Sequence, residues 1–131
     1  MVLIDTSAWI DFFRDASSPY GQIVDNLLAD DFVCTCNLVI AELAPAAPTR
    51  RKYEEILDSL RALPVLGDPP DIWERVMEAG FSLRRKGVNG VGIPDLLIAA
   101  VAGFHKVPVF SKDRHFAAIH DHLGLSLFEP F

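Results

Sequence analysis

The segment VLIDTSAWIDFF (residues 2–13) joins two different hydrophobic patterns. Its first part is a short apolar run that ends at Asp5, which is typical of a buried strand. Large apolar side chains then recur at helical spacing, at Trp9, Ile10 and Phe13. The segment therefore predicts a strand followed directly by a helix, with an acid at the junction.

The same alternation continues along the chain. Strand-like runs follow at residues 32–35, 64–66, 107–110 and 125–128. Helical patterns lie between them at residues 23–28, 37–44, 50–62, 71–86, 95–104 and 114–122, with Asn37 as the expected N-cap of the third helix. We expect the helix at residues 96–104 to be buried because it is apolar on every side. Strands that alternate with helices predict an α/β fold whose central, mainly parallel sheet of about four to five strands has helices on both faces.

Length and composition favour one folded domain over residues 1–131. Half of the residues are apolar, 23% are charged and the formal net charge is −6. The longest uncharged stretches are about half of the ~20 residues that a membrane-spanning helix needs. The first residues lack the basic start of a secretory signal, so we expect a cytoplasmic protein.

The cysteines and the basic residues have ordinary structural explanations. Cys34 and Cys36 lie one residue apart in a strand-like run, without a second cysteine pair, so we expect them to pack in the core. Half of the twelve Lys and Arg residues form two triplets, at residues 50–52 and 84–86. Each triplet either meets an anionic partner or lies in solvent at a helix end.

Four acids lie near the ends of the predicted strands and helices. Asp5 and Asp113 each follow a predicted strand, Asp95 opens the apolar helix, and Glu42 lies near the end of the helix after the second strand. Helix capping, a favourable helix dipole or a turn could each explain Asp5, Asp95 or Asp113 alone. Glu42 interrupts an apolar helical stretch, and a buried acid there would need a partner. Because ligand sites of parallel sheets gather at the carboxyl ends of the strands, the four acids are expected to converge.

Converging carboxylates repel one another unless a cation offsets their charge. Oxygen ligands suit a hard divalent ion, so the pattern points to Mg²⁺ or Mn²⁺ and not to Zn²⁺. A cation held in this way commonly engages phosphate oxygens and activates water. The acids therefore predict metal-dependent hydrolysis of a phosphodiester bond.

Four segments in order resemble the signature blocks of PIN domains, and more narrowly those of the VapC toxins of bacterial and archaeal toxin–antitoxin pairs. They are VLIDTSAWID (residues 2–11), VIAEL (residues 39–43), IPDLLIAA (residues 93–100) and VFSKDRHF (residues 109–116). The resemblance extends along almost the whole chain. It implies an endoribonuclease toxin that leaves 5′-phosphate and 3′-hydroxyl ends, forms a homodimer and is inhibited by a small VapB-like antitoxin protein.

The resemblance also implies a role for each matching residue. It makes Asp5 and Asp95 the principal metal-binding acids, and Glu42 and Asp113 the acids that complete the pocket and orient water. Thr6 and Ser7 would contact the metal shell or the scissile phosphate, although helix capping explains them equally well. The substrate-binding set implied by the resemblance is completed by Ser111, where the family more often has Thr. Apart from the resemblance, Arg114 and Lys112 flank Asp113, and they either contact substrate phosphates or lie in solvent.

A PIN-like module that binds RNA or protein without catalysis is the alternative interpretation. The presence of all four acids favours the enzyme, since a degenerate copy is expected to lose at least one. The four histidines are not arranged as a nucleophile and base, and we expect them at the surface: His105, His115, His120 and His122.

Overall fold

A parallel sheet of four strands forms the centre of the computed structural model, which describes residues 1–130. Phe131, the last residue of the expected domain, lies outside the described residues. The strands are β1 (Val2–Ile4), β2 (Val33–Cys36), β3 (Val65–Leu66) and β4 (Val109–Phe110), in the order β3-β2-β1-β4. All three neighbouring pairs are parallel. The carboxyl ends of β1 and β4 are therefore side by side.

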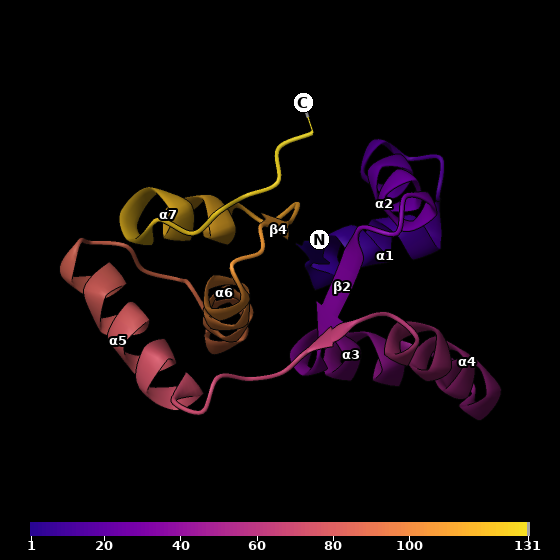
Figure 1. Cartoon of the computed structure of the whole chain (residues 1–131), viewed down its shortest axis with the longest axis horizontal. Helices are drawn as coiled ribbons and strands as arrows, with labels where there is room; N and C mark the ends of the chain where they lie inside the picture. Colours follow the sequence, from indigo (N-terminus) through magenta and orange to yellow (C-terminus); the bar gives the residue numbers. More distant parts are fainter. Residues whose placement is uncertain (131) are drawn as a thin grey trace.

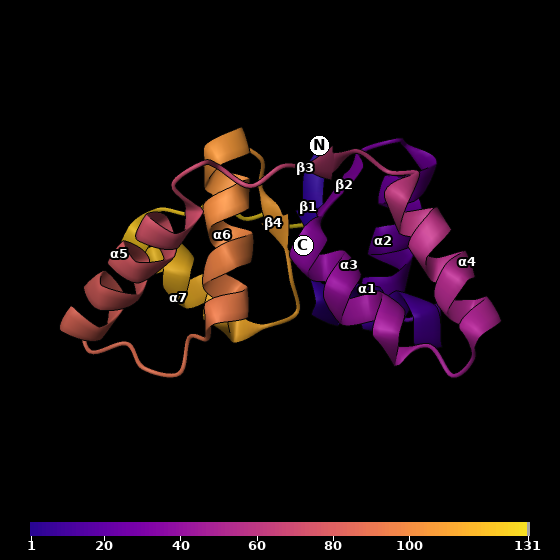
Figure 2. The ribbon, with the colours of Figure 1, turned by 90° about the horizontal axis from the view of Figure 1, so that it is seen from below.

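Seven α-helices flank this sheet, as the α/β prediction requires. They are α1 (Thr6–Arg14), α2 (Pro19–Ala29), α3 (Asn37–Leu43), α4 (Arg50–Arg61), α5 (Ile72–Arg85), α6 (Ile93–His105) and α7 (Arg114–Leu123), with a 3₁₀ turn at Ala44–Ala46. Figures 1 and 2 show them in two groups, with α1 to α4 on one side of the strands and α5 to α7 on the other. No helix within residues 1–130 has the length and apolar character that a membrane span requires.

The core lies where the strands meet the inner faces of these helices. Leu3 and Ile4 of β1 are fully buried. The side chains of Cys34 and Cys36 are also buried, which confirms that they pack in the core, and burial raises the pKa of the Cys34 thiol to about 11. Helix α6 buries its central residues, but Phe104 near its end is 43% exposed. The prediction that this helix is buried all round was therefore wrong at its end.

Two further local predictions were wrong. Residues 125–128 form a single bridge between Leu127 and Val109, because backbone hydrogen bonds join the segment to Val109 alone. The predicted fifth strand is thus absent from the described part of the chain. Asn37 is the first residue of α3 and not its N-cap, since Cys36 occupies the capping position without a side-chain hydrogen bond.

The two basic triplets lie at opposite ends of their helices. Residues 84–86 close α5, where cations complement the helix dipole. Residues 50–52 instead occupy the first turn of α4, where the dipole does not favour them. A favourable interaction with the helix dipole therefore explains the triplet at residues 84–86 but not the one at residues 50–52.

Candidate active site

Asp5 connects the ends of two neighbouring strands. It follows β1, caps the N-terminus of α1 and is 5% exposed. Its Oδ2 atom accepts hydrogen bonds from the hydroxyls of Ser7 (2.8 Å) and Ser111 (2.7 Å). Ser111 comes directly after β4, which pairs with β1, so the sheet register brings these residues together. The buried charge of Asp5 is thus stabilised by hydrogen-bond donors.

The two serine hydroxyls also hold the loop that leads into α7. Ser111 Oγ accepts a hydrogen bond from the backbone N–H of Asp113 at 2.8 Å. Ser7 Oγ accepts one from the backbone N–H of Lys112 at 3.1 Å. The hydroxyls therefore fix the position of Asp113 relative to Asp5. Both roles are structural ones that the sequence did not indicate for these serines.

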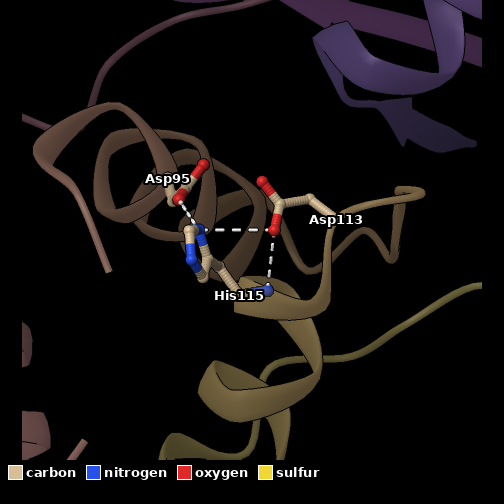
Figure 3. Close-up of side chains that lie close together, drawn as sticks. All are labelled: Asp95, Asp113 and His115. Atoms are coloured by element: carbon tan, nitrogen blue, oxygen red, sulfur yellow. Dashed lines mark hydrogen bonds and ion pairs between the residues drawn. The ribbon is translucent and has the colours of Figure 1, made fainter. Parts of the chain in front are cut away.

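A second group of ionisable side chains lies where α6 and α7 begin. Asp95 is in the first turn of α6, Asp113 is the N-cap of α7, and His115 is in the first turn of α7. One donor atom from each lies within 4.8 Å of the others. His115 Nδ1 is 2.9 Å from Asp95 Oδ2 and 3.3 Å from Asp113 Oδ1 (Figure 3). The sequence prediction of a surface position for His115 missed this arrangement.

The electrostatic environment disfavours the charged form of Asp95. Burial raises the pKa of its carboxyl above 3.8, and the negative charges of Asp113 and Asp5 raise it further. The hydrogen bond from His115 opposes this shift. Asp5 lies near enough for its negative charge to act on Asp95. A bound cation would relieve the repulsion among them.

Glu42 is attached to this region through Thr6. Thr6 Oγ1 donates a 2.7 Å hydrogen bond to Glu42 Oε1, which joins the start of α1 to α3. Glu42 is exposed and is not one of the three donors that cluster within 4.8 Å, and neither is Asp5. The partner expected for a buried glutamate exists, but this side chain lies at the surface.

The basic residues next to Asp113 differ in their surroundings. Lys112 Nζ forms an ion pair with Asp11 at 3.0 Å. Arg114, the first residue of α7, is exposed, and its guanidinium group has no hydrogen bond or ion pair with the side chains and backbone that the structure describes. Arg114 is thus the cation that is free to meet an anionic ligand beside the acids.

The donor set fits a hard divalent cation. Asp95 and Asp113 supply carboxylate oxygens that are part-buried, and Asp5 adds negative charge beside them. His115 is the functional candidate that sequence reasoning overlooked. Its signal was its place two residues after an N-capping acid, in the first turn of a helix that starts at the sheet edge.

Comparisons with known proteins show which family this chain is similar to. The family model described as PIN domain matches residues 2–121. Ribonuclease VapC11 of Mycobacterium tuberculosis is 30% identical over 122 residues, which cover 91% of each chain. Ribonuclease VapC21 of the same species is 32% identical over 98 residues, which cover 73% of this chain and 71% of the relative.

Solved structures of other proteins have a similar fold. VapBC2 from Rickettsia felis, bound to a DNA fragment from its promoter, aligns with a TM-score of 0.75 at 17% identity over 98% of both chains. VapBC-5 from Mycobacterium tuberculosis, a member of the VapBC toxin–antitoxin family, aligns with a TM-score of 0.62 at 31% identity over 89% of this chain and 88% of the other.

Proposed function

This chain belongs to the VapC ribonucleases of the PIN-domain family, and we propose that it is a divalent-metal-dependent endoribonuclease acting as the toxin of a toxin–antitoxin pair. The observation that carries the proposal is the meeting of Asp95 and Asp113 beside Asp5. Three carboxylates that influence one another at the edge of a parallel sheet form a site for a hard cation and a phosphate.

Each residue of the site has a proposed role. Asp5 and Asp95 hold the metal ion, for which we propose Mg²⁺, with Mn²⁺ as a substitute. A divalent cation held by these acids would neutralise charge on the phosphate and would supply an activated water. Glu42 and Asp113 complete the acidic pocket and would orient the attacking water, and one of these two carboxylates would accept the single proton that the water releases. The 5′-phosphate and 3′-hydroxyl ends follow from attack that expels the 3′ oxygen.

The neighbouring hydroxyls and cation complete the site. Ser7 and Ser111 keep the Asp5 carboxylate in place through their hydrogen bonds, and Thr6 does the same for Glu42. Arg114 contacts a phosphate of the RNA backbone, since it is exposed next to Asp113. Water and an RNA strand reach the acids from solvent, because Asp113 retains 35% of its side-chain exposure.

A small VapB-like antitoxin protein is the proposed inhibitor. An acidic site accommodates a cationic side chain well, so an Arg or Lys of the antitoxin would lie among the carboxylates and exclude the metal ion. We also propose that this chain acts in the cytoplasm, because its proposed substrate is RNA. Co-expression with a small antitoxin encoded beside the gene should abolish the growth arrest that we expect when this protein is expressed alone, and persistent arrest would contradict the proposal.

A homodimer is proposed through α5, which presents large apolar side chains to solvent. Trp73, Met77 and Phe81 recur every four residues and are 58%, 63% and 62% exposed. Figure 2 shows α5 at the outer edge of the molecule, with no element beyond it. An apolar row of this kind on one helix is typical of a surface that a partner covers.

The charges beside this apolar row fit a second copy in the opposite direction. The acids Glu74 and Glu78 lie in the first half of α5, and the cations Arg84 and Arg85 lie in its last turn. None of the four forms an ion pair within residues 1–130. Two antiparallel copies of α5 would therefore place the acids of each helix against the cations of the other, as two-fold symmetry requires.

RNA cleavage by the purified protein tests the nuclease assignment. The wild type should cleave RNA with Mg²⁺ and lose this activity in EDTA. Asp5→Asn and Asp95→Asn should reduce cleavage by at least roughly a hundredfold, since each removes a charged metal ligand. Asp121→Asn changes an exposed acid of α7 and should retain full activity. Equal activity in Asp95→Asn, or RNA binding without cleavage by the wild type, would favour a non-catalytic module.

A further inference from the structure

His115 lies between two of the acids and contacts both. Its Nδ1 atom is 2.9 Å from Asp95 Oδ2 and 3.3 Å from Asp113 Oδ1. Its backbone N–H donates a 2.9 Å hydrogen bond to the same Oδ1 atom of Asp113. Figure 3 shows the ring edge pointing at the gap between the two carboxylates. One residue at the start of α7 thus connects two acids, Asp95 and Asp113, that are 18 positions apart in the sequence.

The chemistry of these atoms assigns the hydrogen on the imidazole ring. Ionised carboxylates have acceptor atoms only, whereas a neutral imidazole carries one donor and one acceptor nitrogen. A lone pair on Nδ1 directed at two carboxylate oxygens would be repelled by both. Nδ1 is therefore the protonated nitrogen, and it donates to Asp95 at the shorter distance.

We propose that His115 is a positioning residue of the metal site, whose Nδ1–H group holds the Asp95 carboxylate in the orientation that receives the cation. This inference rests on the proposed function. The bond occupies Oδ2 of Asp95, and Oδ1 has no hydrogen-bond partner among the described residues. Histidine acts here on the carboxylate ligand, in the way that outer hydrogen bonds orient the ligands of metal sites.

The alternative is that His115 itself binds the metal ion, since its ring lies within the same 4.8 Å cluster. A metal bond from Nδ1 would require loss of its hydrogen and of the hydrogen bond to Asp95. The lone pair of the Nδ1–H form is on Nε2, whereas the atom that lies between the two carboxylates is Nδ1. Oxygen-binding cations such as Mg²⁺ do not require a nitrogen ligand, so the donor role is the one the geometry favours.

Binding of Mn²⁺ alone tests the proposal without RNA. The free Mn²⁺ concentration is measured by electron paramagnetic resonance for the wild type, His115→Ala and His115→Asn. The asparagine amide places an N–H group close to the position of Nδ1, whereas alanine has no donor. We expect His115→Ala to weaken Mn²⁺ binding by roughly 10- to 100-fold and His115→Asn to bind nearly as tightly as the wild type. His122→Ala, which changes an exposed histidine on the same helix, is the matched control.

Electron spin echo measurements on bound Mn²⁺ distinguish the two roles of His115. No coupling to a histidine nitrogen is expected in the wild type. A nitrogen coupling that disappears in His115→Ala would make His115 a ligand and overturn the proposal. Unchanged affinity in His115→Ala, or equally weak binding in His115→Asn, would overturn it as well.

The outcome for the wild type separates this inference from the proposed function. If the wild type binds Mn²⁺ but cleaves no RNA, the nuclease assignment fails while the role of His115 is still decided by the affinities of the variants. If the wild type binds no Mn²⁺, both fail together. Thermal unfolding of each variant in EDTA confirms that the compared proteins are folded.

Discussion

Thr6 Oγ1 donates a 2.7 Å hydrogen bond to Glu42 Oε1 across 36 positions of sequence. The bond joins the first residue of α1 to α3, and it restrains an otherwise exposed carboxylate. If Glu42 takes part in the reaction, its orientation depends on this hydroxyl. The pair therefore allows the contribution of Glu42 to be tested without removing its charge.

We expect Thr6→Val to lower kcat for RNA cleavage by about tenfold, because a hydrogen bond to a charged group contributes ~1.5 kcal/mol or more. Valine keeps the shape of threonine but has no donor. Thr6→Ser retains the hydroxyl and should cleave at the wild-type rate. Initial rates at saturating RNA provide the measurement, and a Thr6→Val variant as fast as Thr6→Ser would show that Glu42 does not need this bond.

Asp95→Asn should stabilise the metal-free protein at pH 7. Burial and the charges of Asp113 and Asp5 raise the pKa of Asp95 in the folded state above its ordinary 3.8. The folded protein therefore loses stability as the pH rises from 3.8 through the raised pKa, and this loss remains at neutral pH. Asparagine carries no charge, so the variant avoids the loss.

The advantage of Asp95→Asn should shrink as the pH falls, since both side chains are neutral well below pH 3.8. Urea unfolding in EDTA between pH 4 and pH 7 gives the free energies to compare. Asp121→Asn is the control for removal of an exposed charge. A variant less stable than the wild type at pH 7 would contradict the electrostatic explanation.

Mg²⁺ should stabilise the folded protein by about 2.7 kcal/mol when its free concentration is 100 times the dissociation constant. The cation binds the folded acids and not the unfolded chain. Calorimetric unfolding in Mg²⁺ and in EDTA measures the difference, which should disappear in Asp95→Asn and persist in Asp121→Asn. A wild type whose unfolding temperature is the same in both buffers has no metal site of useful affinity.

The four strands of the sheet, and the places of Asp5, Asp95 and Asp113 at the ends of strands and starts of helices, could be predicted because their signals are local. A short apolar run that ends at an acid, as at Asp5, identifies both a strand and the side chain at its carboxyl end. The parallel sheet then brings such ends together without further information. Asp113 and Asp95 were found in the same way, from their places before α7 and in the first turn of α6.

The features that sequence reasoning missed depend on contacts between distant elements. The position of the His115 ring follows from how α7 packs beside α6, and no local pattern specifies that packing. Residues 125–128 have the composition of a strand, but Gly124 follows α7 with a φ of 75°, and the segment beyond it forms backbone hydrogen bonds with Val109 alone among the described strands. The exposure of Glu42 was likewise decided by which face of α3 meets the core.

The apolar face of α5 predicts a dimer in which the two helices run antiparallel. Met77→Glu should convert the protein to a monomer, because it places a charge in the middle of the buried row. Phe32→Glu changes another exposed apolar side chain, 53% exposed against 63% for Met77, that lies outside α5, and it should leave the dimer intact. Sedimentation equilibrium gives the mass of each variant, and a monomeric wild type would rule out this interface.

The direction of the helices is tested by reversing charges. Arg85→Glu should weaken the dimer, because an antiparallel pairing brings the cations at the end of α5 near the acids at the start of α5 in the second copy, and the change makes both ends negative. Adding Glu74→Arg to the same chain restores two opposite pairs in an antiparallel dimer and should recover most of the affinity. A parallel pairing would set position 74 against position 74 and position 85 against position 85, so the double variant would still place like charges together. Recovery in the double variant therefore requires the antiparallel arrangement, and failure to recover would exclude it.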